Sequence, residues 1–113
     1  MVARSEIWWA ESPSEKRRPY LVLTRQSAIQ HLHSVLAVPA TRTVRGIPTE
    51  VQIGRDDGML ESCALTVDNT LLMPKSFLVE RQCRLGLAKM LEVCLALQIA
   101  TGCTTAAKRG AAS

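Results

Sequence analysis

Residues 6–83 contain short runs of hydrophobic residues separated by polar and turn-forming residues, which is the pattern of β-strands. In residues 6–11, aromatic and β-branched side chains lie between polar ends and predict a strand. Residues 20–24 and 35–39 are continuous apolar runs, which predicts strands buried on both faces. The complete set of predicted strands is 6–11, 20–24, 35–39 with an end near 40–41, 49–53, 62–67 and a short one around 79–83.

Turn-forming residues separate these strands. Residues 12–15 and 54–58 predict turns because they are rich in serine and proline or in aspartate and glycine. Pro19 has no N–H to donate to a sheet, so it predicts the point at which the second strand starts. The polar stretch 25–34 is typical of a loop or a short helical turn. Residues 42–48 predict a loop because they contain both a glycine and a proline.

The periodicity changes near the end of the chain. Across residues 87–100 apolar residues recur at helical spacing, and Gly102 predicts the end of the helix. The apolar stripe of this helix is formed by Leu87, Met90, Leu91, Cys94 and Leu97. Five or six short strands followed by one helix predict a mainly β fold, either an antiparallel barrel or a curled sheet packed on the helix.

The length of 113 residues allows one domain with one hydrophobic core. We expect that domain to cover residues 1–103, and the small, polar residues 104–113 to form a disordered tail. No apolar run approaches the roughly 20 residues that span a bilayer. The first residues carry charges and two tryptophans where a secretion signal would have an apolar core, so the sequence predicts a cytoplasmic protein without a membrane anchor.

The cysteines and histidines do not form a metal-binding motif. The four cysteines, at positions 63, 83, 94 and 103, contain no C-x-x-C pair, and both histidines lie far upstream of them. The sequence also lacks a Walker loop, a G-x-G-x-x-G loop and an H-E-x-x-H motif. We therefore expect neither a metal site nor a cofactor.

The net charge of +4 and the sequence pI near 9.2 permit phosphate binding without demonstrating it. Two groups of residues give this charge a possible use. Arg17 and Arg18 precede Pro19, so they form either an ordinary solvated turn or a pair of guanidinium groups aimed from a rigid strand. A planar guanidinium matches two phosphate oxygens.

The second group follows the third predicted strand. Thr41 lies just past that strand and is followed by Arg42, Thr43 and Arg45. These residues form either a polar loop or a hydroxyl surrounded by cations. Phosphodiester cleavage needs such a cluster because negative charge builds on the phosphorus oxygens in the transition state.

Candidates for proton transfer are weaker. His31 and His33 share a face if their loop is extended, but an ordinary mobile loop is the simpler interpretation. Glu15 and Asp68 are possible carboxylates, for which simple solvation is the simpler interpretation. These residues remain alternatives for the general acid or base.

Taken in order, the segments resemble the MazF/PemK family of toxin–antitoxin ribonucleases, and most closely its actinobacterial paralogues. Residues 4–9, RSEIWW, look like the R-G-[DE]-[IV]-[WY] start of that family, and residues 17–24, RRPYLVLT, look like its R-P-x-[LV]-V-[LI] strand. The later segments that match in order are 38–43, 47–51, 62–69, 74–78 and the helix that ends at Gly102. The chain departs from the pattern at Ser5, where the family usually has glycine, and at Asn69, where glutamine is commoner.

This resemblance implies an SH3-like antiparallel barrel with a C-terminal helix, as in MazF, PemK and CcdB, assembled as a homodimer. It implies a toxin that cleaves single-stranded RNA at selected sequences without a metal, with Arg18 as the key arginine and Thr41 as the key threonine. It also implies a partner, a MazE-like antitoxin whose acidic C-terminal tail covers the RNA groove.

The mechanism that we expect is attack of the RNA 2′-hydroxyl on the adjacent phosphate, giving a 2′,3′-cyclic phosphate and a 5′-hydroxyl, so that DNA is not cut. Base selectivity is expected from the loops 26–34 and 42–48. The residues expected to contact RNA are Arg17, Arg25, Arg42, Thr43, Arg45, Asp68, Asn69 and Lys75. Two alternatives remain: a CcdB-like toxin that binds DNA gyrase and cuts nothing, and a barrel that binds RNA without cutting it.

Overall fold

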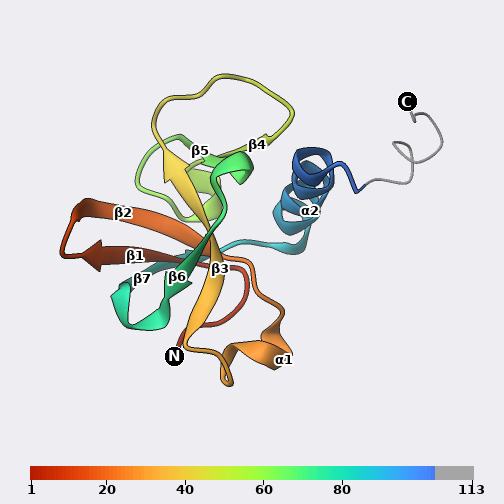
Figure 1. The fold of residues 1–113 in the computed structure, drawn as a ribbon. Coiled ribbons are helices and arrows are strands. Elements are labelled where there is room, and N and C mark those ends of the chain that lie inside the picture. Colours follow the sequence, from red (N-terminus) through yellow and green to blue (C-terminus); the bar gives the residue numbers. More distant parts are fainter. Residues whose placement is uncertain (104–113) are drawn as a thin grey trace.

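The computed structural model describes residues 1–103, and the expected tail at 104–113 lies outside the described residues. Within residues 1–103 the chain forms seven strands, two helices and three short 3-10 turns (Figure 1). The strands are β1 (Glu6–Ser12), β2 (Glu15–Val22), β3 (Ser34–Thr41), β4 (Glu50–Ile53), β5 (Cys63–Thr66), β6 (Leu71–Pro74) and β7 (Leu78–Arg84). The other elements are α1 (Gln26–Ile29), α2 (Leu87–Thr101), η1 (Arg55–Asp57), η2 (Val67–Asn69) and η3 (Lys75–Phe77).

The strands form one antiparallel sheet in the order β4-β5-β3-β2-β1-β7. The long strand β3 links its two parts, because its first half pairs with β6 and its last two residues pair with β5. In Figure 1, β3 crosses the centre of the molecule, with the β1–β2 hairpin on one side and β4 and β5 beyond its end. The sheet is curled but not closed, which fits the expected barrel-like fold.

Burial on both faces of the central strands is confirmed, except at Leu36, which is 45% exposed. Leu21 and Val38 lie in one hydrophobic cluster, which also contains residues of α2, whereas Val22 and Ala37 lie in a second cluster on the opposite face. Successive residues of a strand point to opposite faces, so a continuous apolar run supplies both clusters at once. All four side chains are fully buried.

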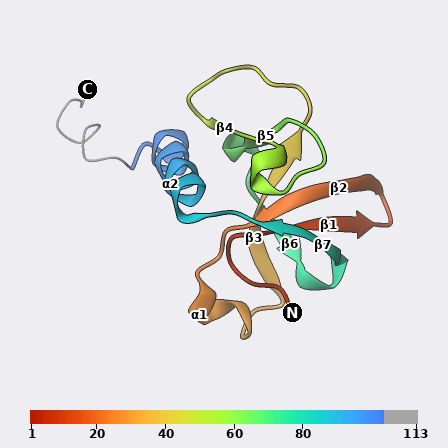
Figure 2. The same ribbon diagram turned by 180° about the vertical axis from the view of Figure 1, so that it is seen from behind.

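Helix α2 follows the sheet and packs on β4 and η2, away from the β1–β2 hairpin in both Figure 1 and Figure 2. Gly102 ends it with a φ of 73°, the left-handed conformation that favours glycine. The expected stripe is partly wrong, because Leu87 and Leu91 are exposed. Most of α2 is apolar all round, so spacing alone does not identify which face packs. The residues that it buries are Met90, Val93 and Ala96.

The second strand differs from its expected bounds. β2 begins at Glu15, not at Pro19, so the basic residues before the proline belong to the strand. The expected turn shrinks to two residues, Pro13 and Ser14, because Ser12 already pairs with Glu15. Cross-strand pairing with β1 holds this polar part of the strand in place, which a hydrophobic pattern does not predict.

Two further features complete the comparison with the expected elements. Strand β6 was not predicted, because its four residues are flanked by two short 3-10 turns and end in a proline. The stretch 25–34 does contain a short helical turn, α1, as one of its two alternatives had it. No helix that the structure describes within residues 1–103 is long and apolar enough to cross a membrane.

Candidate active site

Arg18 and Thr41 face each other across the point where β2 and β3 separate. The last paired positions of these strands are Tyr20 and Pro39, and Arg18 and Thr41 each lie two residues beyond them. The antiparallel register therefore places Arg18 opposite Thr41, on the face that Tyr20 and Pro39 share. Thr41 is the last residue of β3, not a residue beyond its end as expected.

Pro19 explains why the strands separate there. The N–H of Leu23 donates to the carbonyl of Leu36 on β3, so alternate residues of β2 point their N–H groups toward β3. Pro19 is one of these alternate residues, and it has no N–H to donate. Its missing donor faces β3 just past the last paired position, and the strands diverge at this residue.

The environments of the two side chains fit a binding role. Arg18 is exposed on the polar part of β2, which pairs only with β1 there, so its guanidinium is carried by a rigid strand. The Thr41 hydroxyl oxygen accepts the N–H of Thr43 at 3.2 Å. Because that bond uses a lone pair, the hydroxyl proton of Thr41 is left to donate to a bound group.

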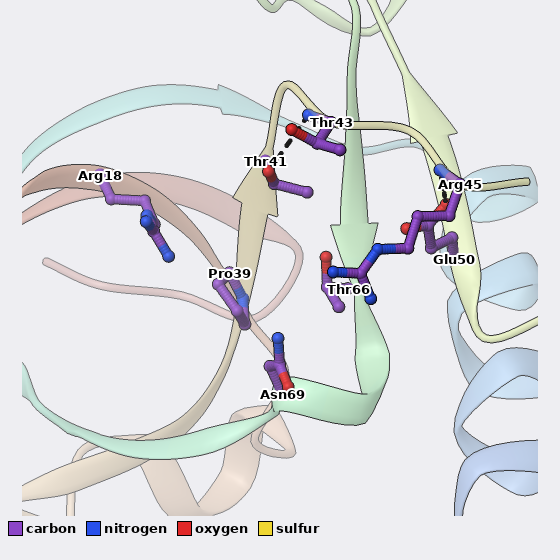
Figure 3. Close-up of a pocket in the computed structure, with 8 residues that line it drawn as sticks. All are labelled: Arg18, Pro39, Thr41, Thr43, Arg45, Glu50, Thr66 and Asn69. Atoms are coloured by element: carbon purple, nitrogen blue, oxygen red, sulfur yellow. Dashed lines mark hydrogen bonds between the residues drawn. The ribbon is translucent and has the colours of Figure 1, made fainter. Parts of the chain in front are cut away.

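A small cavity of about 100 Å³ lies between these residues (Figure 3). The sequence indicated five of its eight lining residues and missed Pro39 on β3, Glu50 on β4 and Thr66 on β5. The lining residues are Arg18, Pro39, Thr41, Thr43, Arg45, Glu50, Thr66 and Asn69. Three hydroxyls, an amide and two guanidinium groups surround this space, which suits it to one anionic group. The carboxylate of Glu50 also lines it, and one of its oxygens accepts the N–H groups of Arg45 and Gly46.

Glu50 holds the loop that carries Arg45. One carboxylate oxygen of Glu50 accepts the backbone N–H groups of Arg45 and Gly46, at 2.9 and 3.0 Å. The backbone N–H of Glu50 in turn donates to the carbonyl of Ile47 at 3.0 Å. These bonds fasten an otherwise exposed connection to β4, and Figure 3 shows the Arg45 side chain reaching toward the cavity from it.

A second, larger cavity of about 530 Å³ shares Arg18 and Thr41 with the first. Its other lining residues come from the β1–β2 hairpin, from β3 and the residue after it, from the connection between η1 and β5 with the first residue of β5, and from β7. They include Trp9, Lys16, Arg17, Arg42, Met59, Leu60, Glu61 and Gln82. Arg17 and Arg42, which the sequence predicted as RNA contacts, line this cavity together with Arg18.

Both of those arginines are engaged with carboxylates. Arg17 forms ion pairs with Glu11, at 2.7 Å, and with Glu80. Hydrogen bonding to Glu11 and then to Glu80 raises the pKa of Arg17, which stays charged. Arg42 pairs with Glu61 at 2.8 Å, and both side chains are largely exposed, so this ion pair contributes little to stability.

Other candidates do not join this site. His31, His33 and Lys75 line a separate hollow next to α1, where the Lys75 amine donates to the carbonyl of Ile29 at 2.7 Å. Arg25 precedes α1 and lines neither cavity that contains Arg18. The structure thus does not bring the two histidines together with Arg18.

The remaining carboxylate candidates lie near the site but outside its lining. Glu15 begins β2 at the hairpin and is exposed. Asp68 accepts a hydrogen bond from the Thr49 hydroxyl, while its neighbour Asn69 lines the small cavity. Of the four acid–base candidates, Glu15 is the one on the same strand as Arg18.

Cys63 is a residue of the hydrophobic core, and Cys83 packs against that core, whereas Cys103 is exposed. Burial raises the pKa of Cys63 and of Cys83, with nearby carboxylates adding to the effect, so both thiols stay protonated at neutral pH. Both are free cysteines, as are Cys94 and Cys103. Within the described residues, no three histidine, cysteine, aspartate or glutamate side chains gather as a metal-binding group.

Comparison with known proteins places this geometry in a family. Residues 3–101 match the family described as PemK-like, MazF-like toxin of type II toxin–antitoxin systems. Two relatives from Mycobacterium tuberculosis are similar over nearly their whole length. "Probable endoribonuclease MazF5" is 36% identical over 103 residues, covering 90% of this chain and 94% of the relative. "Probable endoribonuclease MazF2" is 35% identical over 101 residues, covering 88% and 98%.

Solved structures show the same fold. The structure titled "Mycobacterium tuberculosis toxin MazF-mt6" has a TM-score of 0.79 and 31% identity, covering 86% of this chain and 96% of that one. A mycobacterial structure titled "Endoribonuclease in complex with its cognate antitoxin" has a TM-score of 0.83 and 25% identity, covering 92% and 98%. These similarities confirm the mainly β, barrel-like fold with a C-terminal helix.

Proposed function

The chain belongs to the PemK-like, MazF-like toxin family of type II toxin–antitoxin systems, and from that premise we propose that it is an endoribonuclease that cleaves single-stranded RNA. The observation that carries the proposal is the pairing of Arg18 and Thr41 at the fork between β2 and β3. A guanidinium and a hydroxyl there converge on one cavity. The two relatives described above are both named probable endoribonucleases.

In the proposed reaction, the 2′-oxygen of RNA loses its proton and forms a bond to the adjacent phosphorus. The bond from phosphorus to the 5′-oxygen breaks, and that oxygen gains a proton. The products are a 2′,3′-cyclic phosphate and a 5′-hydroxyl. Arg18 neutralises the charge that builds on the phosphorus oxygens, and Thr41 donates its hydroxyl proton to one of them. Because this guanidinium supplies the positive charge, the reaction as proposed uses no metal ion.

This reaction distinguishes RNA from DNA, since DNA lacks the attacking hydroxyl. It also separates the proposal from the alternative of a CcdB-like toxin that binds DNA gyrase. A gyrase-binding toxin cuts no phosphodiester, so it does not need an arginine and a hydroxyl that point into one phosphate-sized cavity. The named relatives favour RNA cleavage over gyrase binding.

We propose two protein partners for the same toxin. One is a MazE-like antitoxin whose acidic C-terminal tail lies over the basic cavities. The similar mycobacterial endoribonuclease solved in complex with its cognate antitoxin supports this partner. The other is a second copy of this chain, forming a homodimer. A toxin that cleaves cellular RNA acts in the cytoplasm, which is where we place this protein.

The test is incubation of the purified protein with a long single-stranded RNA in EDTA, with DNA of matched sequence beside it. We expect discrete cuts in the RNA alone, with 2′,3′-cyclic phosphate and 5′-hydroxyl ends. A single 2′-deoxy substitution at a mapped cut should abolish that cut and leave the others. RNA that stays intact in EDTA and in magnesium would overturn the proposal in favour of gyrase binding or RNA binding without cleavage.

A further inference from the structure

The larger cavity is joined to the smaller one through the two residues that bind the phosphate in the proposed function. Arg18 and Thr41 line both cavities. The smaller one, at about 100 Å³, is too small for a nucleotide, whereas the larger one, at about 530 Å³, falls within the range of roughly 300–1,000 Å³ that is usual for organic ligands. A nucleotide attached to the bound phosphate can therefore enter the larger cavity.

Trp9 contributes a fixed aromatic surface to this cavity. Its indole N–H donates to the Gln82 side-chain oxygen at 2.9 Å, and the Gln82 amide donates to the carbonyl of Gly58 at 3.0 Å. The guanidinium of Arg17 lies over the indole ring, 5.1 Å from its centroid. The polar atom of Trp9 is therefore satisfied within the protein, and what Trp9 offers to a ligand is apolar ring surface.

Leu60 contributes an apolar side chain from another element. It lies between η1 and β5 and is 70% exposed, so it adds little to the core. Its neighbour Met59 is buried and lines the same cavity. An exposed leucine beside a fixed tryptophan gains contacts only when a ligand covers it.

We propose that the larger cavity is a nucleobase subsite, which takes the base of the nucleotide next to the cleaved phosphodiester against Trp9 and Leu60. The inference rests on the proposed function. A base is flat and has an apolar face, and bases of single-stranded RNA stack on aromatic side chains. The base is tethered to the phosphate on Arg18 and Thr41, which the cavity shares. Of the two loops that the sequence indicated for base selection, the loop 26–34 contributes no residue to this cavity, and the loop 42–48 contributes Arg42.

The experiment combines a substitution in the protein with removal of a base from the substrate. A short RNA that spans one mapped cut is made in a series, each member lacking the base of one nucleotide. Unaltered protein should lose about 5- to 150-fold in kcat/KM when the base in the subsite is missing, the value of one stacked base. In Leu60→Ser, removal of the base in the subsite should cost less than in unaltered protein, while removal of any other base should cost the same. The reason is that the substitution and the base removal delete the same contact.

The control is Leu87→Ser, which alters a leucine that is similarly exposed, at 76%, and lines neither cavity. It should leave the whole base-removal profile unchanged. Trp9→Leu provides a second variant with an expected effect at the same position. A 2-aminopurine base placed there, in RNA made uncleavable by a 2′-deoxy group at the cut, should be quenched by unaltered protein and less by both subsite variants.

The outcomes separate the inference from the function on which it rests. If the protein cleaves RNA but Leu60→Ser and Leu87→Ser give the same base-removal profile, the subsite is wrong and the ribonuclease stands. If Leu60→Ser instead changes the effect of removing a base remote from the cut, the subsite is also wrong. If unaltered protein cleaves no RNA, the proposed function fails and the inference falls with it.

Discussion

The register of β2 and β3 is what brings Arg18 and Thr41 together. Neither residue type is unusual, and Arg18 is one of two adjacent arginines on the same strand. Arg17 makes ion pairs with Glu11 and Glu80, whereas Arg18 lines the smaller cavity with Thr41, which Arg17 does not reach. Neighbouring residues of a strand point to opposite faces, so adjacent arginines have different surroundings.

The first prediction tests this assignment at the level of one side chain. Arg18→Ala should lower the rate of RNA cleavage by about a hundredfold, since removing one donor to a developing oxyanion commonly costs on the order of 3 kcal/mol. Arg84→Ala, which removes an exposed arginine from β7, should leave the rate unchanged. Single-turnover cleavage gives the rates and circular dichroism checks the folds. A well-folded Arg18→Ala protein with full activity would contradict the assignment.

At the scale of elements, the turn that contains Gly58 is packed against β7. Gly58 has a φ of 97°, and a Cβ added there would lie 2.6 Å from the Cβ of Cys83. Gly46 also has a positive φ, of 71°, but a Cβ there meets no atom within 4 Å. The two glycines therefore separate backbone strain from crowding.

Alanine substitutions should reveal that difference. Gly46→Ala should lower the free energy of unfolding by about 1–2 kcal/mol, the cost of a left-handed conformation for a residue with a Cβ. Gly58→Ala should lower it by about 1–3 kcal/mol more, because the contact with Cys83 adds overpacking. Urea denaturation measures both. Equal losses would show that the turn moves away from β7 at little cost.

The loop between β3 and β4 depends on one carboxylate. Glu50→Ala removes the acceptor for the N–H groups of Arg45 and Gly46, so hydrogen exchange at these two amides should quicken by about tenfold. Cleavage should slow because Arg45 is no longer held at the cavity. Glu92→Ala, on an exposed face of α2, is the matched control. Unchanged exchange at both amides would rule out this role for Glu50.

Elements differ in how far the sequence predicts them. The runs of β2 and β3 are apolar enough to predict strands, and the central burial follows from them. The sequence does not predict β6, because four residues contain too few periods of alternation. It does not predict which face of α2 packs either, because apolar residues lie on all sides of that helix. Local pattern lacks the tertiary contact that decides both cases.

The site shows the same division. Resemblance to a family indicated Arg18 and Thr41, and the register of two strands places them opposite each other. Trp9 and Gln82 are distant in sequence and meet only because β1 pairs with β7, so no local signal joins them. Conversely, the histidines at 31 and 33 are chemically attractive but lie in another hollow.

At the scale of the whole molecule, the position of the positive charge matters more than its sum. The basic residues that give the net charge of +4 lie in different parts of the molecule. Arg18 and Arg45 line the small cavity, whereas Lys75 lies in the hollow near α1, where its amine donates to the Ile29 carbonyl. Only cations that track the RNA backbone release counterions when RNA binds.

Salt dependence of binding measures how many cations do so. With RNA made uncleavable by a 2′-deoxy group, the logarithm of affinity should fall linearly with the logarithm of salt concentration, by about 0.7 for each phosphate contacted. Arg45→Ala should reduce the steepness by about 0.7, while Lys75→Ala should leave it unchanged, although both variants remove one positive charge. Fluorescence anisotropy between about 50 and 200 mM salt covers the sensitive range. Equal reductions in the two variants would mean that RNA responds to total charge and that the cavity around Arg18 does not set its path.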